Sequence, residues 1–87
     1  MTRYTIGYDR KAEKQLEAVR DLRPALALKS AIEGLAETPR PPGCVKMSGY
    51  ADRWRIRVGD WRVVYRIEDG RLVVLVVTVG LRGGVYR

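Results

Sequence analysis

The chain has 87 residues, a length that suits one compact domain over residues 1–87 and is too short for two. Its net charge is +7, and residues from Lys46 onward include nine basic and four acidic side chains, which favours an anionic partner. One cysteine and no histidine exclude an intramolecular disulfide and leave a zinc site almost no ligands, so we expect no metal and no other cofactor.

Membrane insertion is not indicated by the sequence. No apolar run approaches the ~20 residues of a spanning helix. The N-terminus also lacks the apolar region of a signal peptide. We therefore expect a cytoplasmic protein without a membrane partner.

The N-terminal segment predicts a strand followed by a helix. Polar and apolar residues alternate over residues 3–8, as in a strand with one buried face. Asp9 can cap a helix that runs from Arg10 to about Asp21. Its apolar residues recur at helical spacing, at Ala12, Leu16 and Val19.

A second helix is predicted after a short link at Leu22 and Arg23. Pro24 suits the first turn of that helix, which continues to about Glu37 with apolar positions Leu28, Ile32 and Leu35. The two helices should form an antiparallel hairpin. Residues 38–44, with the sequence TPRPPGC, can extend neither a helix nor a central strand, and they mark the passage to a sheet.

The remainder of the chain predicts strands. They are a short one over Val45–Met47, a hairpin of Arg53–Val58 and Trp61–Ile67 around a Gly59-Asp60 turn, and Arg71–Val79 after an Asp69-Gly70 turn. The last strand is almost wholly apolar, so we place it inside the sheet. The expected fold is α+β, with the helix hairpin packed on one face of a mainly antiparallel, roughly four-stranded curved sheet, on the side of Trp54, Ile56, Val63 and Tyr65.

The opposite face of the predicted hairpin is rich in arginine. Arg53, Arg55 and Arg57 alternate with apolar residues and share one side of their strand. The turn then places Arg57 opposite Arg62 and Arg53 opposite Arg66, and like charges directly opposite each other destabilise a sheet. We infer that an anion normally sits over this face, the alternative being an ordinary solvated face.

Continuing the register through the second turn gives this face an apolar floor. The expected neighbours are Arg62 with Val77, Arg66 with Val73, and Val64 with Leu75. An exposed floor of this kind suits a groove that takes up a partner segment as well as phosphates. The alternative is that another part of the chain covers these valines.

Few of the usual catalytic groups are present, but arginine and tyrosine can cleave RNA without a metal. A base removes the 2′-hydroxyl proton, the oxygen attacks the adjacent phosphorus, and guanidinium groups stabilise the dianionic transition state. Tyr86 is the best candidate base. Its pKa, ordinarily ~10, would have to fall beside positive charge, and Arg82 lies four residues before it.

The order of elements and three segments resemble the RelE family within the RelE/ParE superfamily of bacterial toxins. The segments are RWRIRVGDWRVVYRI, EDGRLVVLVVTVG and LRGGVYR, and the resemblance covers essentially the whole chain. It implies a toxin that cleaves messenger RNA in the ribosomal A site and forms a hetero-oligomer with an acidic, partly disordered antitoxin. The resemblance implies a catalytic set of Arg55, Arg57, Arg62, Arg82 and Tyr86, and we expect RNA contacts from Lys46, Arg53, Arg66 and Arg87.

One departure leaves two alternatives open. Many members of the family carry a histidine where this chain has Leu81, and a leucine cannot move a proton. The first alternative is a ParE-type toxin that binds DNA gyrase without cutting RNA. The second is a catalytically inactive relative that survives as a binding partner.

Overall fold

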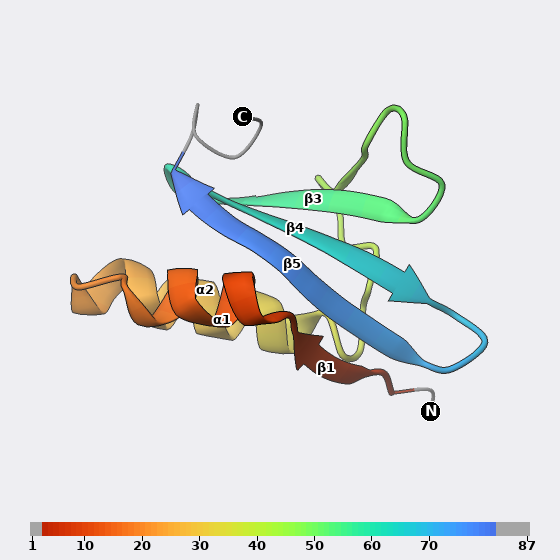
Figure 1. The fold of residues 1–87 in the computed structure, drawn as a ribbon, viewed down its shortest axis with the longest axis horizontal. Coiled ribbons are helices and arrows are strands. Elements are labelled where there is room, and N and C mark those ends of the chain that lie inside the picture. Colours follow the sequence, from red (N-terminus) through yellow and green to blue (C-terminus); the bar gives the residue numbers. More distant parts are fainter. Residues whose placement is uncertain (1–2, 82–87) are drawn as a thin grey trace.

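In the computed structural model, which describes residues 3–81, two helices lie on one side of a five-stranded sheet (Figure 1). The elements follow in the order β1 (Thr5–Tyr8), α1 (Arg10–Glu17), α2 (Leu22–Gly34), β2 (Val45–Lys46), β3 (Arg53–Val58), β4 (Trp61–Glu68) and β5 (Val73–Leu81). This is the predicted α+β architecture.

The strand order β1-β5-β4-β3-β2 places β5 between β1 and β4. β1 runs parallel to β5, and the other three strand pairs are antiparallel. The predicted sheet is therefore confirmed with one strand more than expected, because both the N-terminal strand and the two-residue β2 join it. β5 is an inner strand, as its continuous apolar run predicted.

α1 begins at the predicted residue. The Asp9 side chain accepts a hydrogen bond from the backbone N–H of Ala12 at 2.8 Å and so caps the first turn. The helix ends at Glu17, before the predicted end near Asp21, and residues 18–21 connect it to α2.

α2 starts at Leu22, which the sequence had placed in the link, and Pro24 lies in its first turn. A missing N–H costs nothing there, since the first amides of a helix have no partner within it. The helix ends at Gly34 rather than at Glu37. Within residues 3–81, neither helix has the length and apolar character needed to cross a membrane.

The core lies between the helices and the sheet face that carries Trp54 and Tyr65, as predicted. Full burial of one such apolar side chain contributes about 1.5–3 kcal/mol. The buried members are Ala12, Leu28, Ile32, Leu35, Ile56, Val63, Tyr65, Ile67, Val74, Val76 and Val79. Neither helix covers the opposite sheet face (Figure 1).

At the end of β5, β4 pairs with one edge of the strand and α1 supplies an acceptor to the other edge. β1 ends at Tyr8, and Asp9 donates its N–H to the carbonyl of Val76. Beyond that point the side-chain oxygen of Gln15 accepts a hydrogen bond from the backbone N–H of Val79 at 2.8 Å. Gln15 thus satisfies an amide of β5 that β1 is too short to reach.

The predicted register between β4 and β5 is wrong, first because of the turn. Asp69 and Gly70 are only half of a four-residue connection over residues 69–72, so Glu68 pairs with Val73. The positive φ of this connection, 55°, lies at Leu72. A leucine gives no sequence signal for such a conformation, which usually favours glycine.

A bulge then shifts the register by one more residue. Tyr65 pairs with Val76, but the preceding residue of β4, Val64, pairs with Thr78, two positions further along β5, which leaves Val77 as the extra residue. The observed partners are Gly80 for Arg62, Thr78 for Val64 and Leu75 for Arg66, in place of the predicted Val77, Leu75 and Val73.

Candidate nucleic-acid interface

The arginine face is the part of the sheet that β3 and β4 present away from the helices. Its five arginines are Arg53, Arg55, Arg57, Arg62 and Arg66. They alternate with residues of the core face, and the register sets Arg57 opposite Arg62 and Arg53 opposite Arg66. Both predicted like-charge pairs are therefore present.

An acid of the same chain moderates one of these pairs. Arg66 donates from Nε to a carboxylate oxygen of Asp52 at 3.0 Å, and both side chains are partly exposed. The repulsion between Arg53 and Arg66 is therefore partly offset within the chain, and the charge that Arg66 can offer to an anion is reduced. The inference that an anion sits over this face stays a prediction.

The other pair lies beside the β3–β4 turn. Arg57 is exposed and takes part in none of the ion pairs described for residues 3–81. Arg62 and the neighbouring Arg55 are partly buried, and the Nε atom of each is buried. Arg55, Arg57 and Arg62 thus occupy neighbouring positions on the arginine face.

The apolar floor beneath the arginines is mostly covered. Val64 and Val77 are only 3% and 8% exposed, and both lie outside the core cluster. The chain itself therefore covers these two valines. Leu75 and Thr78 remain partly exposed on this face.

Lys46 does not join the arginine face. It pairs with Trp54, whose side chain packs against the core, so the lysine shares the side of the sheet that carries the helices. Its Nζ lies 6.0 Å from the centre of the Trp54 ring. Lys46 thus lies apart from the arginine face, and its predicted RNA contact stays a prediction.

Three predicted site residues, Arg82, Tyr86 and Arg87, lie outside the described residues, and their roles stay predictions. β5 ends at Leu81, opposite Trp61, the first residue of β4 after the Gly59-Asp60 turn. Arg82 follows directly in the sequence.

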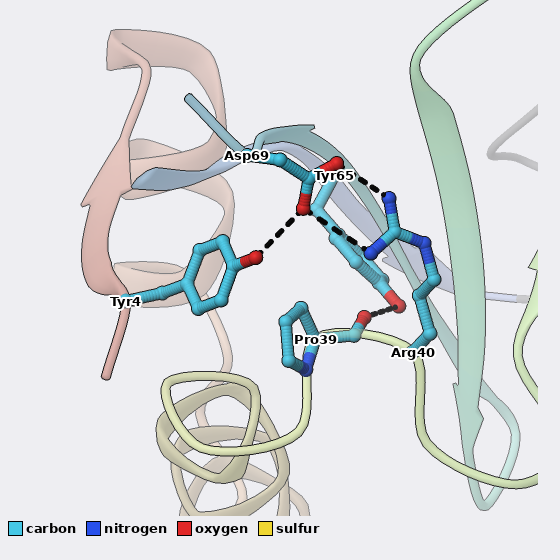
Figure 2. A network of polar contacts seen from close by, with 5 residues as sticks. All are labelled: Tyr4, Pro39, Arg40, Tyr65 and Asp69. Atoms are coloured by element: carbon cyan, nitrogen blue, oxygen red, sulfur yellow. Dashed lines mark hydrogen bonds and ion pairs between the residues drawn. The ribbon is translucent and has the colours of Figure 1, made fainter. Parts of the chain in front are cut away.

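A polar network that the sequence did not predict supports the other end of the sheet (Figure 2). Arg40 binds both carboxylate oxygens of Asp69, at 3.3 and 2.9 Å, and the Tyr4 hydroxyl donates to the same carboxylate at 2.7 Å. Tyr65 donates to the carbonyl oxygen of Pro39 at 2.8 Å. The 38–44 connection is thereby tied to β4 and to the start of β1.

These contacts shift ionisation in ways that follow from geometry. The hydrogen bonds from Arg40 and then from Tyr4 hold the pKa of Asp69 below its ordinary 3.8. Burial raises the pKa of Tyr65, since a phenolate would lose its hydration in the core. Asp69 therefore stays ionised and Tyr65 stays uncharged near neutral pH, so the hydrogen bonds of the network persist over the physiological pH range.

Two aromatic side chains carry cations on their rings. The guanidinium of Arg40 lies 4.9 Å from the centre of the Trp54 ring, and that of Arg53 lies 4.5 Å from the centre of the Tyr50 ring. Tyr50 borders the arginine face. The sequence did not indicate it as a site residue, because it lies in a connection without periodicity.

The arginine face can bind and stabilise anions with its own groups. Guanidinium groups donate hydrogen bonds in a planar fork that matches phosphate oxygens. No group of three or more potential metal ligands occurs among residues 3–81. What these side chains themselves supply is positive charge and directed donors for a phosphate that gains charge during a reaction.

Comparison with solved structures shows the same fold in bacterial and archaeal proteins. RelE of the archaeal RelE–RelB complex from Pyrococcus horikoshii has a TM-score of 0.81 at 24% identity, over 97% of this chain and 99% of that one. The isolated Escherichia coli RelE toxin has a TM-score of 0.78 at 28% identity, over 90% and 83%. The YoeB/ParE toxin from Agrobacterium tumefaciens has a TM-score of 0.78 at 19% identity, over 90% and 98%.

The sequence itself identifies the family. No curated protein matches it directly. A family model described as the ParE toxin of the type II toxin–antitoxin system parDE matches residues 6–86, which is nearly the whole chain. The chain therefore belongs to the ParE toxin family of type II toxin–antitoxin systems, within the RelE/ParE superfamily that its sequence resembles.

Proposed function

We propose that this toxin is a metal-independent endoribonuclease that cuts messenger RNA in the ribosomal A site and so inhibits translation. The observation that carries the proposal is the cluster of Arg55, Arg57 and Arg62 on the sheet face away from the helices. A gyrase-binding surface does not require guanidinium groups to converge, whereas a phosphate that becomes dianionic does.

The proposed reaction is an in-line attack of a 2′-oxygen on the adjacent phosphorus, which breaks the bond from that phosphorus to the 5′-oxygen of the next nucleotide. The products are a 2′,3′-cyclic phosphate and a 5′-hydroxyl, whose oxygen takes up a proton from solvent. Arg57, the exposed member of the cluster, contacts the phosphate oxygens, and Arg55 and Arg62 hold the developing charge. Arg82 joins them and Tyr86 takes the 2′-hydroxyl proton. Arg53, together with Arg66 and Arg87, binds the flanking strand.

The proposed partners are the ribosome with its messenger RNA and a cognate antitoxin. The net charge of +7 favours an acidic, partly disordered antitoxin that covers the arginine face. RelE proteins from Pyrococcus horikoshii and Escherichia coli are found in complexes with RelB, which supports a hetero-oligomer of this kind. We place the complex in the cytoplasm, where ribosomes are.

Inhibition of DNA gyrase is the second candidate, and two observations favour it. The matching family model is that of the ParE toxin. Leu81, 54% exposed at the end of β5, stands where many RelE relatives carry a histidine and can transfer no proton. A protein that only binds its target has no need of that group.

The deciding experiment is primer extension on a reporter messenger RNA translated in a purified system. Wild-type protein should produce cuts in the A-site codon, and Arg57→Ala should reduce cleavage roughly 10²- to 10³-fold through the loss of one donor to the reacting phosphate. The variant should fold at least as stably as the wild type, because it removes one partner of a like-charge pair.

Arg20→Ala is the matched control, since Arg20 is also an exposed arginine but lies in the connection between the helices. It should cleave as the wild type does. If growth arrest persists while no cuts appear with folded wild-type protein, the ribonuclease proposal fails. A gyrase supercoiling assay then tests the second candidate directly.

A further inference from the structure

Tyr50 is an exposed aromatic side chain at the border of the arginine face. It lies in the connection between β2 and β3 and is 47% exposed. The Arg53 guanidinium lies 4.5 Å from the centre of its ring, so one ring face is occupied by a cation. Stacked arginine and aromatic planes of this kind are typical platforms for unpaired nucleobases.

Core packing gives no reason for a tyrosine at position 50. The ring is not among the side chains packed against the core, and its hydroxyl takes part in none of the hydrogen bonds described for residues 3–81. A tyrosine retained only for stability would ordinarily bury its ring or satisfy its hydroxyl. The Tyr50 ring thus leaves apolar area in solvent.

The connection that carries Tyr50 is held at both ends. The backbone N–H of Met47 donates to the carbonyl of Arg53 at 2.9 Å. Asp52 accepts from the Arg66 side chain at 3.0 Å, and its carbonyl accepts from the N–H of Ile67 at 3.3 Å. The ring is therefore presented on a short, anchored loop, which reduces the ordering cost of binding.

We propose that Tyr50 and Arg53 form a stacking subsite for a nucleobase of single-stranded RNA. Arg53 and Arg57 lie four residues apart on one face of β3, a separation of roughly 13 Å at 3.3 Å per residue. The stacked base is thus one that flanks the phosphate held near Arg57. This inference rests on the proposed RNA function and adds to it a position that holds a base.

The test is the affinity of purified toxin, freed of antitoxin, for a labelled ten-nucleotide RNA whose 2′-hydroxyls are all methylated to prevent cleavage. Fluorescence anisotropy gives the Kd. Tyr50→Ala should weaken binding roughly 5- to 150-fold, the range reported by alanine substitution for one stacked base. Tyr50→Phe keeps the ring and should bind within about twofold of the wild type.

A series of the same RNA with one base removed at a time separates stacking from folding. At one position, loss of the base should weaken wild-type binding and abolish the effect of Tyr50→Ala, because both changes delete the same contact. A Tyr50→Ala effect of equal size on every member of the series would mean that the loop is merely distorted, and it would overturn the subsite.

Two further variants distinguish a failure of the stacking subsite from a failure of the proposed RNA binding on which it rests. Arg57→Ala should weaken binding, and Leu22→Ala, on an exposed residue of α2, should not. If Arg57→Ala weakens binding while Tyr50→Ala does not, the subsite falls and RNA binding stands. If neither variant differs from the wild type, both proposals fall.

Discussion

A single carboxylate, that of Asp69, joins three parts of the chain that are far apart in sequence. It accepts hydrogen bonds from Arg40 in the 38–44 connection and from Tyr4 before β1. These donors favour the ionised carboxylate and lower its pKa. The contact is exposed, so its benefit depends on ideal bidentate geometry rather than on burial.

The sign of this pKa shift predicts how stability depends on pH. Because the folded-state pKa of Asp69 lies below the unfolded value of about 3.9, its contribution is full above that value and is lost as the pH falls through the folded-state pKa. Asp69→Asn should therefore lower the melting temperature at pH 7 and have little effect at pH 2. Thermal denaturation followed by circular dichroism at both pH values measures the difference.

Asp60→Asn is the control for that measurement. Asp60 is likewise an exposed aspartate in a hairpin turn, but it takes part in none of the hydrogen bonds or ion pairs described for residues 3–81. Its replacement should leave stability unchanged at both pH values. An equal loss for the Asp69 variant at pH 2 and pH 7 would show that the carboxylate charge is not what stabilises the fold.

At the scale of an element, helix α1 completes the backbone hydrogen bonding of strand β5 through Gln15. Its side chain accepts the N–H of Val79, which is only 2% exposed. Gln15→Leu keeps the size but leaves this amide without its acceptor, and we expect the free energy of unfolding to fall by about 1–3 kcal/mol. Urea denaturation measures the change, provided that the unfolding free energy of both proteins depends on urea concentration with the same slope.

Gln15→Glu tests whether the acceptor is what matters. A carboxylate at that position can accept the same hydrogen bond, so the glutamate variant should retain most of the stability that Gln15→Leu loses. Equal destabilisation of both variants would instead point to the shape of the side chain. A loss below about 0.5 kcal/mol for Gln15→Leu would contradict the role assigned to this contact.

The helices and strands were largely predictable from local sequence pattern, whereas the register between β4 and β5 was not. Alternating residues fixed β3 and β4, and the two-residue Gly59-Asp60 turn fixed their pairing. The pairing of β5 depends instead on a positive φ at Leu72 and on a bulge at Val77. Within a run of valines, apolar character alone cannot reveal which residue is the extra one.

The candidate site was predictable only where it lies on a regular strand. The arginines of β3 and β4 could be placed by alternation, whereas Arg40 and Tyr50 lie in connections without periodicity. Arg40 meets Asp69 across 29 positions of sequence, a distance over which local pattern carries no information. The side of the sheet on which Lys46 lies could not be predicted, because in a two-residue strand it is set by the pairing with Trp54.

At the scale of the whole molecule, the two faces of the sheet differ in what covers them. The helices cover one face of the sheet, and the other carries five arginines, of which Arg66 is paired with Asp52. A polyanion bound there would release counterions in proportion to the phosphates that it neutralises.

This arrangement predicts the salt dependence of binding to the uncleavable RNA. If Arg53, Arg55, Arg57 and Arg62 each neutralise one phosphate, log Kd should rise with log salt at a slope of about 2.8, or about 50-fold between 50 and 200 mM. Arg57→Ala should lower the slope by about 0.7, and Arg20→Ala should leave it unchanged. A wild-type slope near zero would mean that the arginine face does not bind phosphate, whereas an Arg20→Ala slope as low as that of Arg57→Ala would mean that net charge, rather than this face, attracts the RNA.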